Sequence, residues 1–326
     1  MLSTHKVEVV RVKLRPHPNA DTLSIVDVFD GFPCIVRTSD WKDGDLAAYI
    51  PPDSVVDVTR PEFAWLGGGT KTRHHVKTVK LRGALSYGLL MPAPPGAELG
   101  DDVSEIYGVV HYEPEMHLGT KEGEAILAPV LLRSVPKYDI DALRRHRHVF
   151  EPGEPVVVTE KIHGANSRYS CHAGEMWCGS RGEWKKKDVL NLYWRALTPE
   201  MEAFCQSSPG TILYGEVYGQ VQDLHYGLKN RVAFRAFDVL DTSLGEYLPE
   251  HCMRDMLTAI GVPVVPLLEE MPFDFDAVCE LAEGPSTVPG ADHVREGCVV
   301  RPVKERWHQT IGRVILKVVG SGYLDR

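Results

Sequence analysis

The chain has 326 residues, 43% of them hydrophobic, and a formal net charge of −9 at pH 7. This length predicts about two domains of ~100–200 residues each, with enough core to need no disulfides. The negative charge argues against a general nucleic-acid coat protein, although an enzyme that acts on nucleic acid needs only a local basic surface.

No apolar run approaches the ~18–20 residues of a membrane span, and the N-terminus lacks the apolar segment of a signal peptide. The seven cysteines form no CxxC pair, and the fourteen histidines show no zinc-binding spacing. We therefore expect buried free thiols in a protein of the reducing cytoplasm, with no membrane partner.

Residues 1–110 hold short predicted strands separated by turns, with little helix, a pattern typical of a small β-barrel of the OB type. An Asp-Gly pair at 30–31 predicts a hairpin turn. The predicted strands are 7–12, 23–29, 34–37 and 46–51.

Residues 111–130 mix proline, glycine and charge and predict a connection, so we place the boundary between a first domain, 1–125, and a second, 126–326. The irregular alternation of predicted strands and helices in the second domain indicates an α+β fold. Its predicted strands are 154–162, a hairpin over 167–180, 211–218, 232–240, 296–302 and 314–319. Its predicted helices are 140–148, 188–205 with a break near Pro199, 250–260 and 274–282.

The most informative segment is 160–166, EKIHGAN, in which Lys161 closes a β-branched strand before a glycine turn. Any single KxxG is far more often a surface lysine ahead of a turn. The functional alternative is a lysine nucleophile that points into a pocket. Such a lysine has to be neutral and its ordinary pKa is about 10.4, so burial or nearby cations would have to lower that pKa.

Five later residues strengthen the functional interpretation, because they follow Lys161 on successive predicted strands or turns. Each alone is a weak signal, since a core strand with one exposed charge is common. The order of the whole series is the stronger signal. The residues are Arg181 after the hairpin, Glu216, Phe237, Glu296 and Lys317.

This series resembles the covalent nucleotidyltransferases, which comprise nucleic-acid ligases and mRNA capping enzymes. It is most similar to ATP-dependent RNA ligases of the phage RNA-ligase-2-like group, over residues 130–320. The resemblance implies an antiparallel-sheet, ATP-grasp-like nucleotidyltransferase domain within the α+β class.

The resemblance also implies how ATP is bound. Lys161 matches the residue that takes AMP in a phosphoramidate bond, and Lys317 matches a lysine near the α-phosphate. Glu160 matches a residue that contacts adenine, and Phe237 matches the aromatic that stacks on it. Residues 137–140 resemble the segment that backs this adenine pocket.

The remaining implied roles concern phosphate and metal. Asn166 and Arg181 match residues that act on the AMP phosphate and the nucleic-acid 5′ end, while Glu216 and Glu296 match metal-organising carboxylates. Phosphoryl transfer needs in-line positioning and charge neutralisation more than acid–base chemistry. Carboxylates hold Mg²⁺ or Mn²⁺ through oxygen or bound water, so the expected cofactors are ATP and Mg²⁺ or Mn²⁺.

The sequence departs from the wider superfamily at three points. His163 stands where DNA ligases and capping enzymes have aspartate, which favours the RNA ligases. Val319 stands where the phage pattern has a second lysine. The sequence ends at Arg326, soon after Lys317, where DNA ligases and capping enzymes continue into a C-terminal OB domain.

Residues 15–23, RPHPNADTL, resemble the HPNADxL signature of tRNA-binding OB modules. The alternative is a structural turn in which Asn19 and Asp21 bond the local backbone. An OB module ahead of this ligase core resembles the RNA ligases of the Deinococcus and Naegleria type. Basic and aromatic residues at 184–187 and 193–195 suit a nucleic-acid path, although a solvated helix face is the commoner explanation.

These features predict an ATP-dependent RNA ligase that joins 3′-OH and 5′-phosphate RNA ends at nicks in RNA-containing duplexes, in RNA repair, with no obligate protein partner. Two other functions stay open: a tRNA- or RNA-binding accessory protein with an inactive ligase core, and a capping-type nucleotidyltransferase. The intact series from Lys161 to Lys317 argues against the accessory protein. His163 and the absent C-terminal OB domain argue against the capping enzyme.

Overall fold

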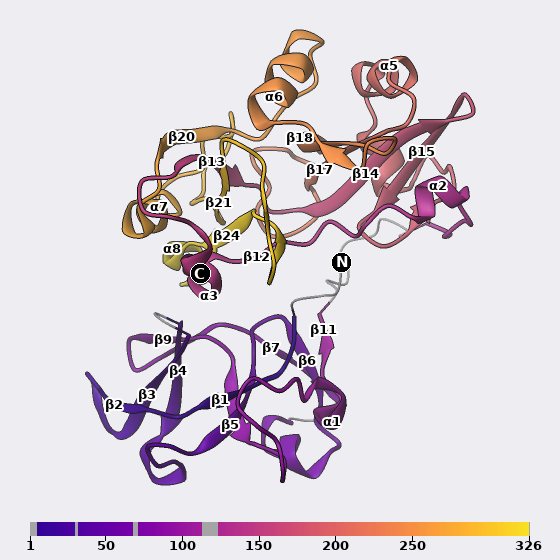
Figure 1. Ribbon diagram of the computed structural model, residues 1–326. Coiled ribbons are helices and arrows are strands. Elements are labelled where there is room, and N and C mark those ends of the chain that lie inside the picture. The colour runs from indigo at the N-terminus through magenta and orange to yellow at the C-terminus, as the bar shows by residue number, and fades with distance from the viewer. Residues whose placement is uncertain (1–4, 30–31, 68–70, 113–122, 326) are drawn as a thin grey trace.

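The computed structural model describes residues 5–29, 32–67, 71–112 and 123–325, and its strands fall into two groups (Figure 1). Within these ranges, the strands up to residue 111 pair only with one another, and the strands from residue 141 onward do the same. The fold is therefore α+β, with an N-terminal module followed by a larger two-sheet domain.

The N-terminal module is a set of short antiparallel strands, which agrees with the OB-type barrel expected of it. Its strands are β1 (Glu8–Arg11), β2 (Leu14–His17), β3 (Ala20–Phe29), β4 (Phe32–Arg37), β5 (Leu46–Ile50), β6 (Ser54–Asp57), β7 (Arg73–Val76), β8 (Val79–Leu81), β9 (Ala84–Ser86), β10 (Leu89–Pro92) and β11 (Val110–His111). They form sheets of order β1-β5-β10, β2-β3-β4, β11-β6-β7 and β8-β9, and helix α1 (Ser104–Tyr107) precedes β11. The Asp-Gly pair at 30–31 lies outside the described residues, but β3 and β4, on either side of it, do pair antiparallel.

The HPNAD segment joins β2 to β3 and is held by side-chain bonds to a distant turn. His17 Nε2 lies 3.1 Å from the carbonyl oxygen of Leu81, and Asn19 Nδ2 donates to the carbonyl of Arg82 at 2.9 Å. The segment therefore has a structural use within the barrel. Within the segment, His17 Nδ1 also accepts a bond from the backbone N–H of Asn19 at 3.1 Å, so the local backbone and the β8–β9 turn both hold it.

The second domain contains two sheets. Its strands are β12 (Asp141–Ala142), β13 (Pro155–Lys161), β14 (Ala165–His172), β15 (Glu175–Ser180), β16 (Trp184–Lys185), β17 (Thr211–Gly219), β18 (Val232–Asp241), β19 (Glu246–Tyr247), β20 (Leu267–Pro272), β21 (Gly297–Pro302), β22 (Trp307–His308), β23 (Gly312–Arg313) and β24 (Leu316–Val319). One sheet has the order β12-β24-β21-β13-β20 and the other β16-β15-β14-β17-β18-β19, while β22 and β23 form a small ribbon. All pairs are antiparallel except β12 with β24, and the predicted strands are confirmed to within a few residues.

The helices differ more from the predictions. They are α2 (Val130–Arg133), α3 (Leu143–His146), α4 (Leu192–Ala196), α5 (Pro199–Ser207), α6 (Glu250–Ala259), α7 (Phe275–Leu281) and α8 (Ser321–Leu324). The short helix predicted over 140–148 is confirmed only from residue 143, where α3 and a 3-10 turn (Arg147–Val149) lie, because Asp141 and Ala142 pair with β24 as a strand. The break expected near Pro199 is confirmed: Asn191 caps α4, Thr198 caps α5, and the proline occupies the first turn of α5.

Strand β20 was not predicted. Its sequence, LLEEMP, lacks the alternation of a half-buried strand, and most of its side chains are exposed. Among the strands of the described residues it pairs only with β13, at the edge of the five-stranded sheet. Charged residues are tolerated on such an edge, so the period-2 signal disappears from the sequence.

The cysteines are free thiols, as expected, and five of the seven are buried. Cys252 on α6 is exposed, so the prediction of burial is wrong for that residue. In the described part of the chain, no helix combines the length and apolar character that crossing a bilayer requires.

Candidate active site

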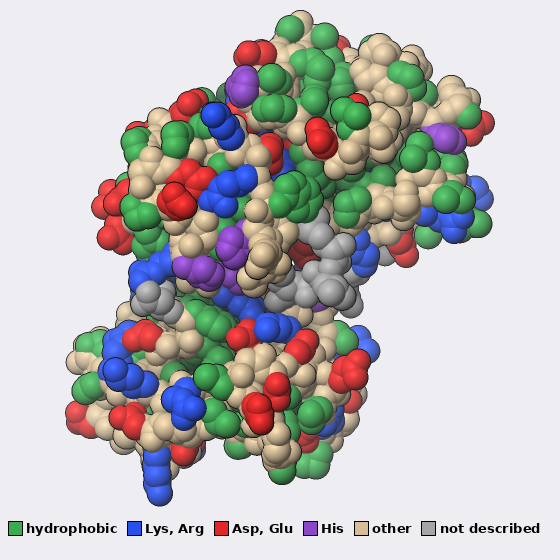
Figure 2. Space-filling view, viewed as in Figure 1, with side chains coloured by type: hydrophobic (Ala, Val, Ile, Leu, Met, Phe, Trp, Pro, Cys, Tyr) green, Lys and Arg blue, Asp and Glu red, His purple; other side chains and the backbone are tan. Residues whose placement is uncertain are grey.

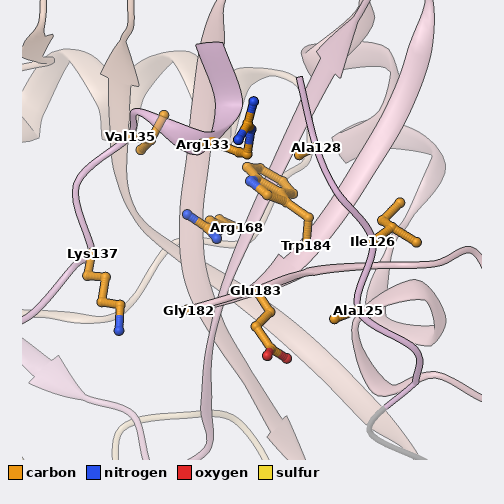
Figure 3. Close-up of a pocket in the computed structure, with 10 residues that line it drawn as sticks. All are labelled: Ala125, Ile126, Ala128, Arg133, Val135, Lys137, Arg168, Gly182, Glu183 and Trp184. Carbon is orange, nitrogen blue, oxygen red and sulfur yellow. The ribbon is translucent and has the colours of Figure 1, made fainter. Parts of the chain in front are cut away.

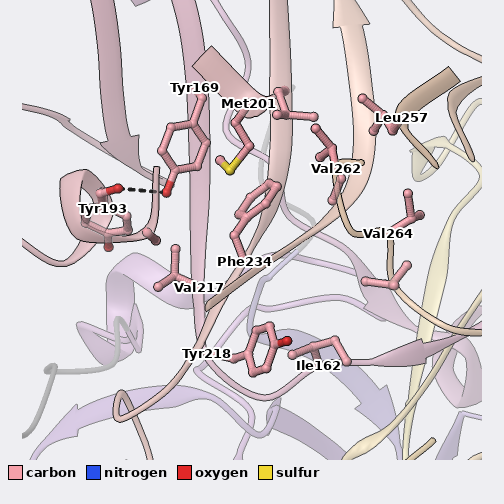
Figure 4. Close-up of a cluster of buried hydrophobic side chains, with 14 of the residues drawn as sticks. Ile162, Tyr169, Tyr193, Met201, Val217, Tyr218, Phe234, Leu257, Val262 and Val264 are labelled. Carbon is pink, nitrogen blue, oxygen red and sulfur yellow. Dashed lines mark hydrogen bonds between the residues drawn. The ribbon is translucent and has the colours of Figure 1, made fainter. Parts of the chain in front are cut away.

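Lys161 is the last residue of β13, and the fold explains the glycine three residues after it. The neighbouring Ile162 packs into the hydrophobic cluster of Figure 4, which anchors the end of the strand. At Gly164, a Cβ atom would lie 2.1 Å from the carbonyl oxygen of Val217. A side chain there would push the turn away from β17, so the KxxG spacing is needed to hold the lysine in place.

Lys161 contacts the carboxylate of the residue that directly precedes β21, the next strand of the same sheet. Its Nζ donates to Glu296 Oε2 at 2.7 Å, and Glu216 on the other sheet also acts on it electrostatically. Burial opposes the ammonium charge, but the two carboxylates outweigh burial and raise the pKa of Lys161. The protein's own groups therefore keep this lysine protonated, which is opposite to the lowered pKa that a nucleophile needs.

Their surroundings shift the pKa values of the two carboxyl groups in opposite directions. Burial raises the pKa of Glu216 to about 8, and repulsion from Glu296 adds to this effect while Lys161 opposes it. Burial also disfavours the charge of Glu296, but Lys161 and the hydrogen bond from His163 outweigh it and lower the pKa of Glu296 to about 2. Glu296 is thus the ionised partner of the lysine.

His163 links Glu296 to a second acid. Its Nδ1 lies 3.3 Å from Glu296 Oε2, and its Nε2 lies 2.7 Å from Asp223 Oδ1. Its backbone N–H donates to the Tyr226 hydroxyl at 2.7 Å. An aspartate at this position would repel Glu296, whereas the imidazole holds it in place, so the departure at residue 163 changes how the site is organised.

Asn166, on β14, is the remaining residue expected beside the two carboxylates. It is the register partner of Glu216 across β14 and β17, and its Oδ1 is buried with no hydrogen-bond partner among the described residues. An unpaired buried oxygen beside two crowded carboxylates fits a hard divalent cation. No cluster of three or more His, Cys, Asp or Glu side chains in the described ranges could hold a metal unaided, so substrate phosphate and water would supply the other ligands, as is usual for Mg²⁺.

The two predicted phosphate-binding cations, Lys317 and Arg181, come from different sheets. Lys317 on β24 is the register partner of Val299 on β21, which in turn pairs with Thr159 on β13, so Lys317 lies two strands away from Lys161. Arg181 directly follows β15, and its Nη1 lies 3.4 Å from Asp139 Oδ2.

The two residues expected at adenine have other partners in this structure. Neighbouring strand residues point to opposite faces, so Glu160 diverges from Lys161. The Glu160 carboxylate accepts bonds from Ser286 Oγ at 2.5 Å and from the backbone N and Oγ1 of Thr287 at 2.7 and 2.6 Å. Phe237 on β18 packs against Tyr138, with ring centroids 4.8 Å apart.

Sequence reasoning missed a buried ion network that supports this region. Asp238, fully buried on β18, accepts a bond from the Tyr138 hydroxyl at 2.6 Å and pairs with Arg301 at 3.5 Å and with Arg313. Arg313 pairs in turn with Glu305 at 2.7 Å. The network ties the segment before β12 to both sheets, and the only sequence signal for it was an acid inside an apolar strand.

We expect Asp238→Asn to lower the free energy of unfolding by about 3–5 kcal/mol, because removal of one partner leaves buried arginines without their counter-charge. Urea unfolding measures this effect, and Asp255→Asn on the exposed side of α6 is the matched control. A change below about 1 kcal/mol, the range of a surface ion pair, would contradict the assignment of the network to stability.

The N-terminal module also reaches the site, through a residue that the sequence did not single out. Asp53, before β6, has a left-handed backbone with φ 63° and lies 3.3 Å from His75 Nε2. Burial opposes its charge, but the bond to His75 and the nearby Lys317 outweigh burial and lower the pKa of Asp53. Figure 2 shows lysine, arginine and histidine side chains gathered along the junction of the two halves.

The chain belongs to the RNA ligase family, which matches residues 154–319, half of its length. An OB-fold domain family matches residues 5–93, and no curated protein matches the sequence. Among solved structures, the apo form of an RNA ligase from Naegleria gruberi is 23% identical with a TM-score of 0.83, covering 99% of this chain and 98% of that one.

The Naegleria ligase has also been solved with nucleotides. A form with ATP and Mn is 23% identical with a TM-score of 0.82, covering 98% of each chain. A form with AMP and Mn is 22% identical with a TM-score of 0.82, covering 99% of this chain and 98% of that one. The fold expected from the resemblance, an OB module ahead of a ligase domain, is therefore confirmed over both domains.

Proposed function

We propose that this protein is an ATP-dependent RNA ligase that seals 3′-OH and 5′-phosphate RNA ends at nicks in duplexes, through a lysyl-AMP intermediate. The observation that carries the proposal is the position of Lys161 at a strand end, 2.7 Å from Glu296 and under the influence of Glu216, in a chain of the RNA ligase family. The Naegleria ligase structures with ATP and Mn or AMP and Mn support the choice of nucleotide and metal.

In the first step, the Lys161 nitrogen attacks the α-phosphate of ATP. A phosphorus–nitrogen bond forms, the bond from the α-phosphorus to the bridging oxygen breaks, and pyrophosphate leaves. The ammonium first has to lose its proton to solvent water, which the pairing with Glu296 opposes. A divalent cation held by Glu216 and Glu296, with the Asn166 oxygen nearby, would supply positive charge that neutralises phosphate and weakens that pairing.

The other predicted residues have supporting roles in this proposal. Lys317 and Arg181 offer positive charge to the α-phosphate and to the RNA 5′ end, and Phe237 presents an aromatic face to adenine. Glu160 already accepts three hydrogen bonds, and a carboxylate has about four acceptor positions, so one position is left for adenine. AMP then passes from Lys161 to the RNA 5′-phosphate, and the 3′-OH displaces it to close the phosphodiester.

Incubation of the protein with labelled ATP or GTP and Mg²⁺ or Mn²⁺ tests the proposal. Label from ATP on the protein is expected. Label from GTP alone would support the capping-type function, and no label from either nucleotide would support the RNA-binding accessory function. We further propose a cytoplasmic protein with a domain boundary near residue 125 and no obligate protein partner.

The N-terminal module is expected to matter more for nicks than for ATP. Residues 124–126 make backbone hydrogen bonds to the ligase domain. The N–H of Lys186 donates to Glu124 O at 2.8 Å, and the N–H of Ile126 donates to Trp184 O at 2.9 Å. The fragment 123–326 keeps both bonds. We expect it to form the Lys161 adenylate but to seal nicks poorly, because a barrel face adds contacts to the nucleic-acid backbone.

Measurement of adenylation and nick sealing on the same fragment decides between the possible uses of the module. Equal loss of both activities would mean that the module only supports folding. Equal retention of both would mean that it serves some other partner.

A further inference from the structure

A pocket lies in the ligase domain, lined in part by the residues that follow Arg181. Figure 3 shows its lining, which comes from the segment before α2, the end of α2, strand β14 and the turn into β16. Its volume is about 260 Å³, and its polar groups are contributed mainly by Arg133, Lys137, Arg168 and Glu183. Three of these four side chains are cationic.

Arg168 is the unusual member of this lining. The residue is only 5% exposed, its Nε is buried without a hydrogen-bond partner, and within the described ranges no carboxylate lies within ion-pair distance of its guanidinium. Its guanidinium lies over the face of Trp184, with the guanidinium carbon 4.4 Å from the ring centroid. A cation–π contact contributes roughly 0.5–2 kcal/mol, which does not offset the several kcal/mol that desolvation of an ion costs.

The pocket therefore has a buried positive charge that lacks a counter-ion. Glu183 does not supply one, because its carboxylate pairs with Lys185 Nζ at 2.7 Å and is otherwise exposed. Arg133, exposed at the end of α2, adds a second charge at the rim. An anion that offers several acceptor oxygens to a planar guanidinium fits this arrangement, and phosphate is the anion that arginine matches in this way.

The position of the pocket suggests where that phosphate comes from. Arg168 and Asn166 are two residues apart on β14, so their side chains share one face of the sheet at a spacing of roughly 6.8 Å. Gly182, Glu183 and Trp184 of the lining directly follow Arg181. The pocket thus neighbours the residues expected at the RNA 5′ end, both along β14 and along the chain, at a spacing comparable to one nucleotide step.

We propose that the Arg168 pocket binds a backbone phosphodiester of the RNA substrate, next to the 5′-phosphate at the nick. The inference rests on the proposed ligase function. It adds where the RNA strand runs beyond its 5′-phosphate. The Trp184 face orients the guanidinium, Arg168 provides the buried charge, and Arg133 adds charge at the rim. Arg168 and Arg133 take no part in adenylation of Lys161.

Binding and sealing by Arg168→Met test this proposal, because methionine keeps most of the packing on Trp184 and removes the charge. With a 5′-adenylated RNA nick, we expect about tenfold weaker binding and a salt slope of binding smaller by about 0.9, the value for one phosphate contact. The rate of Lys161 adenylation with ATP should be unchanged. Arg168→Lys should restore part of the binding, and Lys304→Gln, an exposed change after β21, should alter nothing.

Replacement of single phosphates by neutral methylphosphonates locates the contact. In the wild-type protein, the replacement at one position adjacent to the nick should weaken binding as much as Arg168→Met does. The same replacement should have no further effect on binding by the Arg168→Met variant. If every position weakens binding equally in both proteins, the pocket does not hold a backbone phosphate. If inorganic phosphate or free ATP raises the thermal unfolding midpoint of the wild type but not of Arg168→Met, while the two proteins bind nicked RNA equally, the pocket serves a soluble anion and the proposal is wrong.

Two further observations distinguish failure of the pocket proposal from loss of folding and from failure of the ligase proposal. Arg133→Gln changes only an exposed side chain, so the protein stays folded, and binding should fall about threefold, as for an exposed ionic contact. If both variants bind nicked RNA as tightly as the wild type, with the same salt slope, the pocket proposal fails while the ligase function stands. If the wild-type protein neither takes label from ATP nor seals RNA, the ligase function itself fails.

Discussion

Lys161→Ala should abolish formation of the protein–AMP adduct, with a loss of more than roughly 10³-fold, because alanine offers no nucleophile. The variant should still seal a nick that already bears 5′-AMP, since that step does not use the lysine nitrogen as a nucleophile. Labelled ATP measures the first expectation and a pre-adenylated RNA nick measures the second. Persistent labelling of the variant would remove Lys161 from the mechanism.

Lys161→Arg is the control for electrostatics. Arginine keeps the positive charge beside Glu296 but does not deprotonate in proteins, so this variant should fold normally and also fail to take AMP. Lys304→Ala, an exposed lysine outside the site, should label like the wild type. A labelled Lys161→Arg protein would show that the pairing with Glu296, and not nucleophilic attack, is what residue 161 contributes.

Glu296→Gln should slow adenylation by about 10²–10³-fold, the range for removal of one preorganised electrostatic contact. Glutamine keeps the size but loses the charge that holds a hard cation, and it also loses the charge that orients Lys161 and His163. Glu216→Gln should have an effect in the same direction. Adenylation rates across a metal titration measure both variants.

The thermal unfolding midpoints of these variants separate chemistry from folding. Glu280→Gln on α7 is exposed and provides the matched control. We expect the rate to fall by far more than the change in stability explains, and higher metal to recover part of it. A Glu296→Gln protein that is fully active at low metal would show that this carboxylate does not organise the cation.

The strands that carry the site could be predicted because local signals agree with the fold. The β-branched run of β13 ends at Lys161, and the glycine that follows is required by the close approach of β17. The hairpin of β14 and β15 turns at Ala173 and Gly174, both with positive φ. In each case, short-range sequence and long-range packing lead to the same conformation.

The missed features depend on contacts between residues far apart in the sequence. The Asp238 network joins β18 to Tyr138, Arg301 and Arg313, and no spacing in the sequence relates these residues. Asp53 reaches the site only because the two domains lie against each other. The basic and aromatic run after Arg181 contained a signal, but Trp184 is a buried strand residue, and not part of a solvated helix.

Nick sealing by the wild-type protein is the most direct test of the central claim. We predict that, with ATP and Mg²⁺ or Mn²⁺, the protein joins a 3′-OH to a 5′-phosphate at a nick in an all-RNA duplex, with a 5′-adenylated strand as intermediate, and more efficiently than at a matched all-DNA nick. A folded protein that seals no RNA nick with ATP and either metal, or one whose Lys161→Ala variant seals a 5′-phosphate nick equally well, would contradict the account.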